Sequence, residues 1–212
     1  RIELITGGPP CQPFSIGGRH RADEDARDMW PEAVRAVREV RPQAFIFENV
    51  KGLTRQTFSA YLGHIVLQLQ YPSIERKKGE TWRDHLDRLH RHHTSGAPLE
   101  YRVIYDLINT ADYGVPQKRE RVVFVGFRAG IADGWSFPRE THSQDALLWD
   151  QYRDGTYWEE HAVAKKDRVI NPRLKARADA MLFRPKVLAW NTVRDAIAGL
   201  PDPEKEPQAA AR

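Results

Sequence analysis

Residues 30–50, WPEAVRAVREVRPQAFIFENV, contain in order the pattern of a helix and the pattern of a buried strand. Apolar side chains recur at helical spacing from residue 30 to residue 40, and Pro42 predicts where the helix ends. The run at 43–50 is almost continuously apolar, which indicates a strand inside a sheet, and it ends in the polar residues Glu48 and Asn49.

The same alternation continues on both sides of this stretch. Residues 2–6 predict a short strand, residues 58–69 a helix, and residues 101–109 and 122–127 two further strands. Strands that alternate with helices indicate an α/β fold, with a mainly parallel sheet flanked by helices.

Residues 72–98 break this rhythm, and we interpret them as a polar, basic insertion that is partly helical over 82–91. Four histidines fall within the insertion, namely His85, His90, His92 and His93. A metal site is one interpretation of them, but acidic or cysteine partners at ligand spacing are missing. We favour the face of a solvated helix. Beyond Arg128 the sequence shows little periodicity until residues 192–201.

Composition bounds the class of protein. The chain has 212 residues, of which 41% are hydrophobic and 29% charged, enough for a domain with a proper core. The net charge of +4 is compatible with a nucleic-acid partner without establishing one. The single cysteine excludes an intrachain disulfide and a cysteine-rich zinc site, so we expect a reducing compartment and no metal. The sequence shows neither an apolar run of about 20 residues nor a signal peptide, so we expect no membrane partner.

Three short motifs stand at the predicted ends of strands: GGPPCQPFS at residues 7–15, FENVKGL at 47–53 and GVPQKRERV at 114–122. Taken singly, they could be a turn, a strand end and a solvated basic face. Together and in this order they resemble the PCQ, ENV and QxRxR motifs of the C5-cytosine DNA methyltransferases. The resemblance covers residues 1–128 closely and 190–203 more loosely. It implies part of a Rossmann-like domain that depends on S-adenosyl-L-methionine.

The resemblance also assigns catalytic roles. Cys11 matches the family's nucleophile, a thiolate that adds to carbon 6 of cytosine so that carbon 5 can attack a methyl group. Glu48 matches the acid at nitrogen 3, and we expect it to be buried, which favours the neutral form of a carboxyl group. Arg121 matches the residue that holds oxygen 2. Arg119 and Asn49 match residues that support the cysteine and its turn.

The target base lies inside double-stranded DNA, so the reaction requires base flipping. We expect residues 15–28 to form a loop that closes on the DNA, with Gly17 and Gly18 as hinges. The residues we assign to DNA contacts are Gln12, Ser15, Arg19 and Arg21. Pro10 is our one candidate for contact with S-adenosyl-L-methionine, because the family's main cofactor loop would precede residue 1.

We therefore expect a partial catalytic core at residues 1–130, an extension towards a target-recognition region at 131–203, and a linker or tail at 204–212. The family's cofactor loop and target-recognition motifs are missing from the sequence. We expect an excerpt, a truncation or one half of a split enzyme, inactive by itself, whose missing segments come from the same parent chain or a partner subunit. The family implies a cytoplasmic bacterial enzyme of a restriction-modification system.

Two alternatives from other functional classes stay open. One is a non-catalytic, DNA-binding or regulatory remnant with the same fold, although it would be free to lose Cys11, Glu48 or Arg121. The other is an unrelated thiol enzyme of the cysteine–histidine type, which would need a partner such as His20 near the cysteine.

Overall fold

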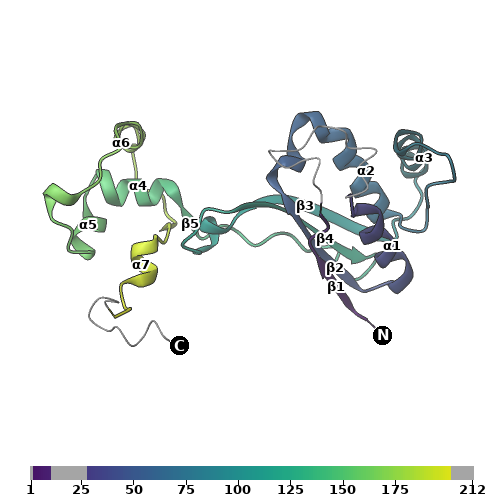
Figure 1. Ribbon diagram of the computed structural model, residues 1–212, viewed down its shortest axis with the longest axis horizontal. Helices are drawn as coiled ribbons and strands as arrows, with labels where there is room; N and C mark the ends of the chain where they lie inside the picture. The colour runs from purple at the N-terminus through teal and green to yellow at the C-terminus, as the bar shows by residue number, and fades with distance from the viewer. Residues whose placement is uncertain (1, 11–27, 202–212) are drawn as a thin grey trace. The chain divides into compact units, whose positions relative to one another are not determined.

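The computed structural model describes residues 2–10 and 28–201, which belong to two compact units (Figure 1). The first unit falls within Arg1–Ile108 and Glu120–Phe137, and the second within Asn109–Arg119 and Pro138–Arg212.

A four-stranded sheet in the order β1-β2-β4-β3 is the centre of the first unit. Its strands are β1 (Leu4–Gly7), β2 (Ala44–Val50), β3 (Tyr101–Asn109) and β4 (Glu120–Arg128). Strand β1 runs parallel to β2, with Ile5 opposite Phe45, whereas β4 runs antiparallel to β2. The sheet is therefore mixed.

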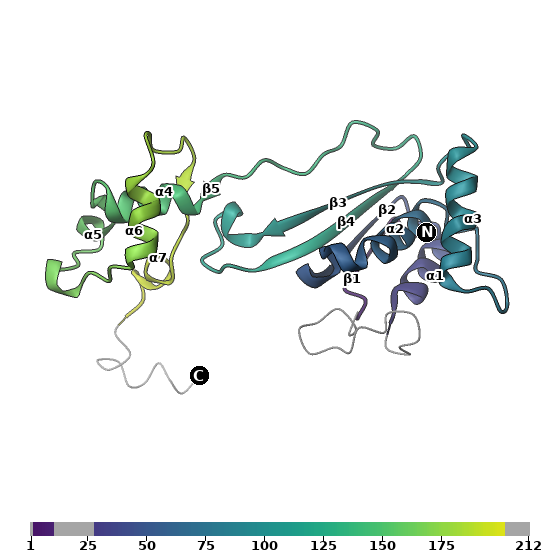
Figure 2. The ribbon, with the colours of Figure 1, turned by 90° about the horizontal axis from the view of Figure 1, so that it is seen from above.

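Helices α1 (Trp30–Val40) and α2 (Ser59–Gln70) cover one face of this sheet (Figure 2). Short 3-10 turns, Lys51–Thr54 and Gln56–Phe58, connect β2 to α2. Trp30 is fully buried, and its ring meets Phe47 and Phe124 edge-on at centroid distances of 6.0 and 5.0 Å. These aromatic contacts fix α1 on the β2–β4 part of the sheet.

Gly126 of β4 creates the space that the neighbouring Phe45 ring needs. A Cβ atom at residue 126 would lie 2.0 Å from Cζ of Phe45, which stands opposite it in the strand register. The fully buried Phe45 ring then stacks on Phe47 at a centroid distance of 5.2 Å. A side chain at this position would disrupt the core between the sheet and its helices.

Helix α3 (Trp82–Thr94) packs on α2 and completes this unit. Thr81 and Asp84 cap its N-terminus reciprocally, since each side chain accepts a hydrogen bond from the other residue's backbone. Trp82, Leu86 and Leu89 recur at helical spacing and are buried. The segment we predicted as a solvated insertion thus has one apolar face inside the core.

The second unit is organised around helix α4 (Gln144–Tyr152), which contacts α5 (Thr156–Glu160) and α6 (Pro172–Asp179). It also contains the short parallel strands β5 (His142–Ser143) and β6 (Leu188–Ala189). The remaining elements are the 3-10 turns Thr110–Tyr113 and Lys165–Asp167 and the short helix α7 (Val193–Ile197).

The predicted α/β class is confirmed, and the elements predicted from residues 2–127 occur with shifts of three residues or fewer at each end. The sequence missed α4, α5 and α6, which fall where it showed little periodicity. Among the helices of the described ranges, none is long and apolar enough to span a membrane.

Candidate active site

The carboxyl end of β2 brings two of the three motifs together. Strand β4 runs antiparallel beside it, so that Val50 stands opposite Arg121 and Glu48 opposite Val123. From these positions Nε of Arg121 lies 2.6 Å from Oε1 of Glu48. The acid of FENVKGL and the second arginine of QKRER therefore form an ion pair across two strands.

This ion pair is partly hydrated. The Glu48 side chain is 41% exposed and the Arg121 side chain 27% exposed, so our expectation that Glu48 is buried is wrong. The reason is the alternation of side chains along β2, because Phe47 and Asn49 are buried and the residue between them points to the other face. An ion pair this exposed adds at most about 1 kcal/mol to stability.

Asn49 joins the end of β2 to the turn after β1. Its side chain is only 4% exposed, and Nδ2 donates a hydrogen bond to the backbone oxygen of Pro9 at 2.9 Å. Its Oδ1 accepts a hydrogen bond from the backbone N–H of Val50 at 2.8 Å. Both ends of the amide are thus satisfied, and the proline turn is tied to the strand that carries Glu48.

The turn after β1 also approaches the Glu48 carboxylate itself. A Cβ atom at Gly8 would lie 3.3 Å from Oε2 of Glu48, so a larger residue would crowd the carboxylate. Further along, the backbone oxygen of Pro10 accepts a hydrogen bond from the N–H of Met29 at 3.1 Å. Residues 10 and 29, on either side of residues 11–27, are therefore joined by a hydrogen bond.

Several predicted site residues have no described position. Cys11, Gln12, Ser15, Arg19 and Arg21 lie outside the described residues, as do the predicted hinges and His20.

Arg119 belongs to the second unit, where its backbone oxygen accepts a hydrogen bond from the N–H of Thr110 at 3.0 Å. Among the described site residues, the structure thus pairs Glu48 with Arg121 and ties Asn49 to Pro9, the neighbour of Pro10.

A second ion pair beside the first was missed by the sequence analysis. Nζ of Lys51 lies 2.6 Å from Oε1 of Glu120, one step beyond the pairing of Val50 with Arg121. The sequence did contain a signal for this pair, namely the opposite charges of Lys51, which follows ENV, and Glu120, which lies within QKRER. Continuing the strand register by one residue would have paired them.

The insertion's histidines are not all solvated. His85 is 1% exposed, and our prediction for it is wrong because it lies on the buried stripe of α3 with Trp82 and Leu89. His90 and His93 are exposed, and His92 is half-buried. In the described part of the chain, the His, Cys, Asp and Glu side chains form no group of three or more that could hold a metal ion.

The chain is similar in sequence to proteins described as type II methyltransferases. M.AquIA of Picosynechococcus sp. is 32% identical over 211 residues, which cover 99% of this chain and 64% of that protein. M.NgoMIV of Neisseria gonorrhoeae is 31% identical over 194 residues, 90% of this chain and 52% of that protein.

A third relative, M.SacI of Streptomyces achromogenes, is 31% identical over 205 residues, which are 94% of this chain and 37% of that protein. The chain thus spans less than two thirds of the length of each of these relatives. The family described as C-5 cytosine-specific DNA methylase matches residues 1–71 and 75–176. The chain belongs to this family.

The family implies S-adenosyl-L-methionine, and the described residues fit only a small part of a site for it. Gly7 to Pro10, at the carboxyl end of β1, offer backbone groups and two proline rings but no charged side chain. The ligand's amino-acid end and ribose hydroxyls call for charged and hydrogen-bonding side chains. We therefore derive no step through the cofactor.

Proposed function

We propose that the protein to which this chain belongs is a DNA (cytosine-5-)-methyltransferase of a restriction-modification system. It acts in the cytoplasm on double-stranded DNA, and S-adenosyl-L-methionine supplies the methyl group. Family membership supports this proposal, together with relatives described as type II methyltransferases. The ion pair of Glu48 with Arg121 beside the proline turn is the observation that carries it.

The cysteine performs the covalent step. The Cys11 thiolate adds to carbon 6 of a flipped-out cytosine, which breaks the aromaticity of the ring and makes carbon 5 nucleophilic. After carbon 5 has gained the methyl group, a base such as a water molecule takes its proton, and nitrogen 3 gives up the proton that it shared with Glu48. The electron pair of that C–H bond then forms the 5,6 double bond and expels the thiolate. The enzyme therefore returns to its starting state.

Glu48 and Arg121 stabilise the ring during the addition. Negative charge moves towards nitrogen 3 and oxygen 2, which are neighbouring atoms on one edge of cytosine. A carboxyl oxygen and a guanidinium nitrogen 2.6 Å apart are spaced to meet two neighbouring atoms of this kind. In the complex with the base, Glu48 takes up a proton and shares it with nitrogen 3, while Arg121 donates a hydrogen bond to oxygen 2.

The other site residues position these groups or bind DNA. Asn49 fixes the proline turn before the nucleophile through its hydrogen bond to Pro9, and Arg119 supports the same loop. Gln12, Ser15, Arg19 and Arg21 contact the DNA. Pro10 contributes to cofactor contact, and the remaining cofactor and target-recognition segments come from the same parent chain or a partner subunit.

A covalent trapping experiment tests this proposal. The full-length protein is incubated with S-adenosyl-L-methionine and DNA that contains 5-fluorocytosine, whose fluorine blocks the final loss of a proton from carbon 5. A protein–DNA adduct should form, and it should be missing from Cys11→Ser. His90→Gln, which changes an exposed residue of α3, is the matched control and should form the adduct normally.

Two outcomes contradict the proposal. A folded protein that binds DNA but forms no adduct on any cytosine sequence would be the non-catalytic remnant. An adduct that persists in Cys11→Ser would assign the nucleophile to another residue. Because Cys11 is the only cysteine of the chain, a persistent adduct would exclude thiol chemistry by this segment.

A further inference from the structure

Two buried histidines form the contact between α2 and α3. His64 of α2 is 4% exposed and His85 of α3 is 1% exposed, and Nε2 of His64 lies 3.1 Å from Nδ1 of His85. The Trp82 ring packs against His64 at a centroid distance of 5.7 Å. Neither histidine takes part in the site described above.

The hydrogen bonds determine which ring nitrogens carry protons. Nε2 of His85 lies 2.8 Å from the backbone oxygen of Ile74, which can only accept, so this nitrogen is the donor. In a neutral ring Nδ1 of His85 must then accept, and Nε2 of His64 donates to it. Nδ1 of His64 accepts from Nε2 of Gln68 at 3.3 Å. With both rings neutral, all four ring nitrogens have a hydrogen-bond partner.

Protonation of both rings breaks this chain of hydrogen bonds. Nδ1 of His85 and Nε2 of His64 would then both carry a hydrogen and would face each other at 3.1 Å. Protonation would also leave a charge on a ring that is almost fully buried. Burial accordingly lowers the pKa of His64 to about 3, with the neighbouring His85 as the next cause, and burial is also the main cause that lowers the pKa of His85.

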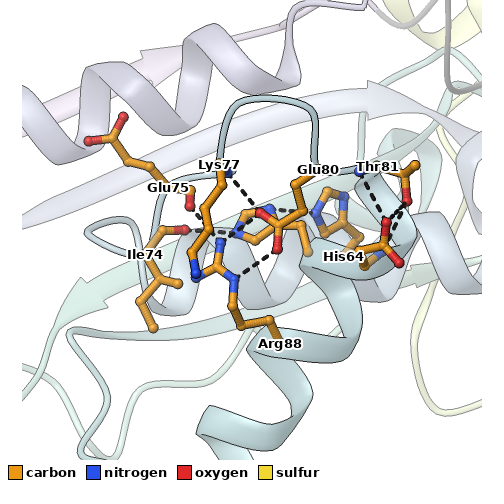
Figure 3. Close-up of polar contacts among 9 residues, drawn as sticks. His64, Ile74, Glu75, Lys77, Glu80, Thr81 and Arg88 are labelled. Atoms are coloured by element: carbon orange, nitrogen blue, oxygen red, sulfur yellow. Dashed lines mark hydrogen bonds and ion pairs between the residues drawn. The ribbon is translucent and has the colours of Figure 1, made fainter.

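The surrounding charges do not supply a counterion for an imidazolium ring. Glu80 is the acidic residue that favours protonation of both histidines, but Arg88 binds its carboxylate through Nε at 2.9 Å and Nη2 at 2.8 Å (Figure 3). Arg88 and Arg76 themselves oppose protonation. From the side of α1, Arg38 contacts Glu75 at 3.2 Å.

We propose that the His64–His85 contact is a pH-sensitive connection that keeps α3 packed on α2 while both imidazoles are neutral and releases α3 when they are protonated. The apolar stripe of Trp82, Leu86 and Leu89 remains available for repacking when the pH returns to neutral. The release is local, because the contact joins α3 to α2 and leaves the pairing of β1, β2 and β4 untouched.

Amide hydrogen exchange of the full chain tests this inference. Protonation of His64 in the open state should raise the opening constant of residues 82–94 about tenfold between about pH 7.5 and pH 5.5. Protonation of His85 should raise it further. Both values are corrected for intrinsic exchange rates. Arg88 lowers the pKa of Glu80 to about 2, so Glu80 does not contribute to a change in this pH range. Amides of β2 and β4 should keep their protection.

Variants make the test specific. His64→Gln keeps an amide donor where Nε2 of His64 stood, so α3 should stay packed while the pH dependence of its opening falls about tenfold. His90→Gln should behave like the unchanged protein, because His90 is exposed. A wild-type α3 whose opening does not depend on pH, or an equal dependence in His64→Gln, would overturn the proposal. So would equal loss of protection in β2 and α3.

A measurement without variants keeps the proposal testable if His64→Gln does not fold. The imidazole resonances of His64 and His85 should stay those of neutral rings through about pH 5.5 in molecules with a protected α3. Titration of His64 near about pH 6.5 with α3 still protected would contradict the inference.

Discussion

Two pairs of titratable side chains in the first unit differ in their exposure to solvent and in the kind of contact that joins them. Glu48 and Arg121 form an ion pair at 2.6 Å with 41% and 27% of their side chains exposed. His64 and His85 form a hydrogen bond at 3.1 Å with 4% and 1% of the residues exposed. The first pair is open to solvent, whereas the second keeps its rings neutral because neither water nor an opposite charge is available to an imidazolium.

The comparison explains why only one of these pairs is suited to chemistry. An exposed acid next to an arginine can exchange its partner for a substrate atom with little structural change. The buried histidines have all their hydrogen-bonding groups engaged by protein, so a new proton would charge a ring that water does not reach. Accessibility of the polar atoms therefore separates the candidate catalytic pair from the structural pair.

The largest effect is expected from a substitution in the exposed pair of Glu48 and Arg121. Glu48→Gln should lower the rate of methylation by the full-length protein about 10²–10⁴-fold, because glutamine can donate a hydrogen bond but cannot give a proton to nitrogen 3. Single-turnover kinetics on saturating DNA measure this rate. A variant with an unchanged rate would remove Glu48 from the chemistry.

The next effect concerns the tie between the proline turn and β2. Asn49→Ala leaves the oxygen of Pro9 and the N–H of Val50 without their present partner, so the free energy of unfolding should fall by about 1–3 kcal/mol. Urea denaturation measures the difference. Because the side chain is 4% exposed, an unchanged stability would mean that water replaces both contacts.

The pH dependence of stability should distinguish the buried histidine pair from the exposed ion pair. The folded pKa of His64 lies below its ordinary value, so the folded state binds fewer protons than the unfolded state and stability falls as the pH drops below about 6.5. His64 alone should contribute a loss of about 1.4 kcal/mol between about pH 7.5 and pH 5.5. Glu48→Gln should show the same loss, whereas His64→Gln should show less of it.

The smallest expected effect is at the second exposed ion pair. Lys51→Ala removes the partner of Glu120, yet the free energy of unfolding should change by less than about 1 kcal/mol, because the lysine side chain is 55% exposed. A loss above 2 kcal/mol in urea denaturation would show that exposure is a poor guide to the energetics at this end of the sheet.

Much of the sheet unit could be predicted from the sequence because its elements have strong, regular patterns. The buried residues Trp30, Val34 and Val37 define α1, and Pro42 stands just beyond its end. The antiparallel pairing of β4 with β2 could not be predicted, because the residue pattern of a strand does not show which strand it pairs with or in which direction.

The missed helices have a different physical cause. Helices α4, α5 and α6 are nine residues or shorter, so few apolar positions repeat on one face. Their starts depend on caps, such as Ser143 before α4 and Asn171 before α6. For His85 the signal existed, since Trp82, Leu86 and Leu89 place it on the apolar face of α3, but its polarity favoured the solvated interpretation.

The family resemblance located Glu48 and Arg121 in separate motifs, and the strand register shows how they meet. Their roles, and those of the other site residues, stay predictions. Spacing along the sequence could not show the exposure of Glu48, because that depends on which face of β2 the helices cover.

A double-mutant cycle tests most directly whether Glu48 and Arg121 act together on cytosine. Glu48→Gln, Arg121→Lys and the double variant of the full-length protein are compared by the rate of adduct formation with 5-fluorocytosine DNA. The two residues should be strongly coupled, so that the double variant is about as slow as the slower single variant. A double variant slowed by the product of the two single effects would contradict their acting as one unit.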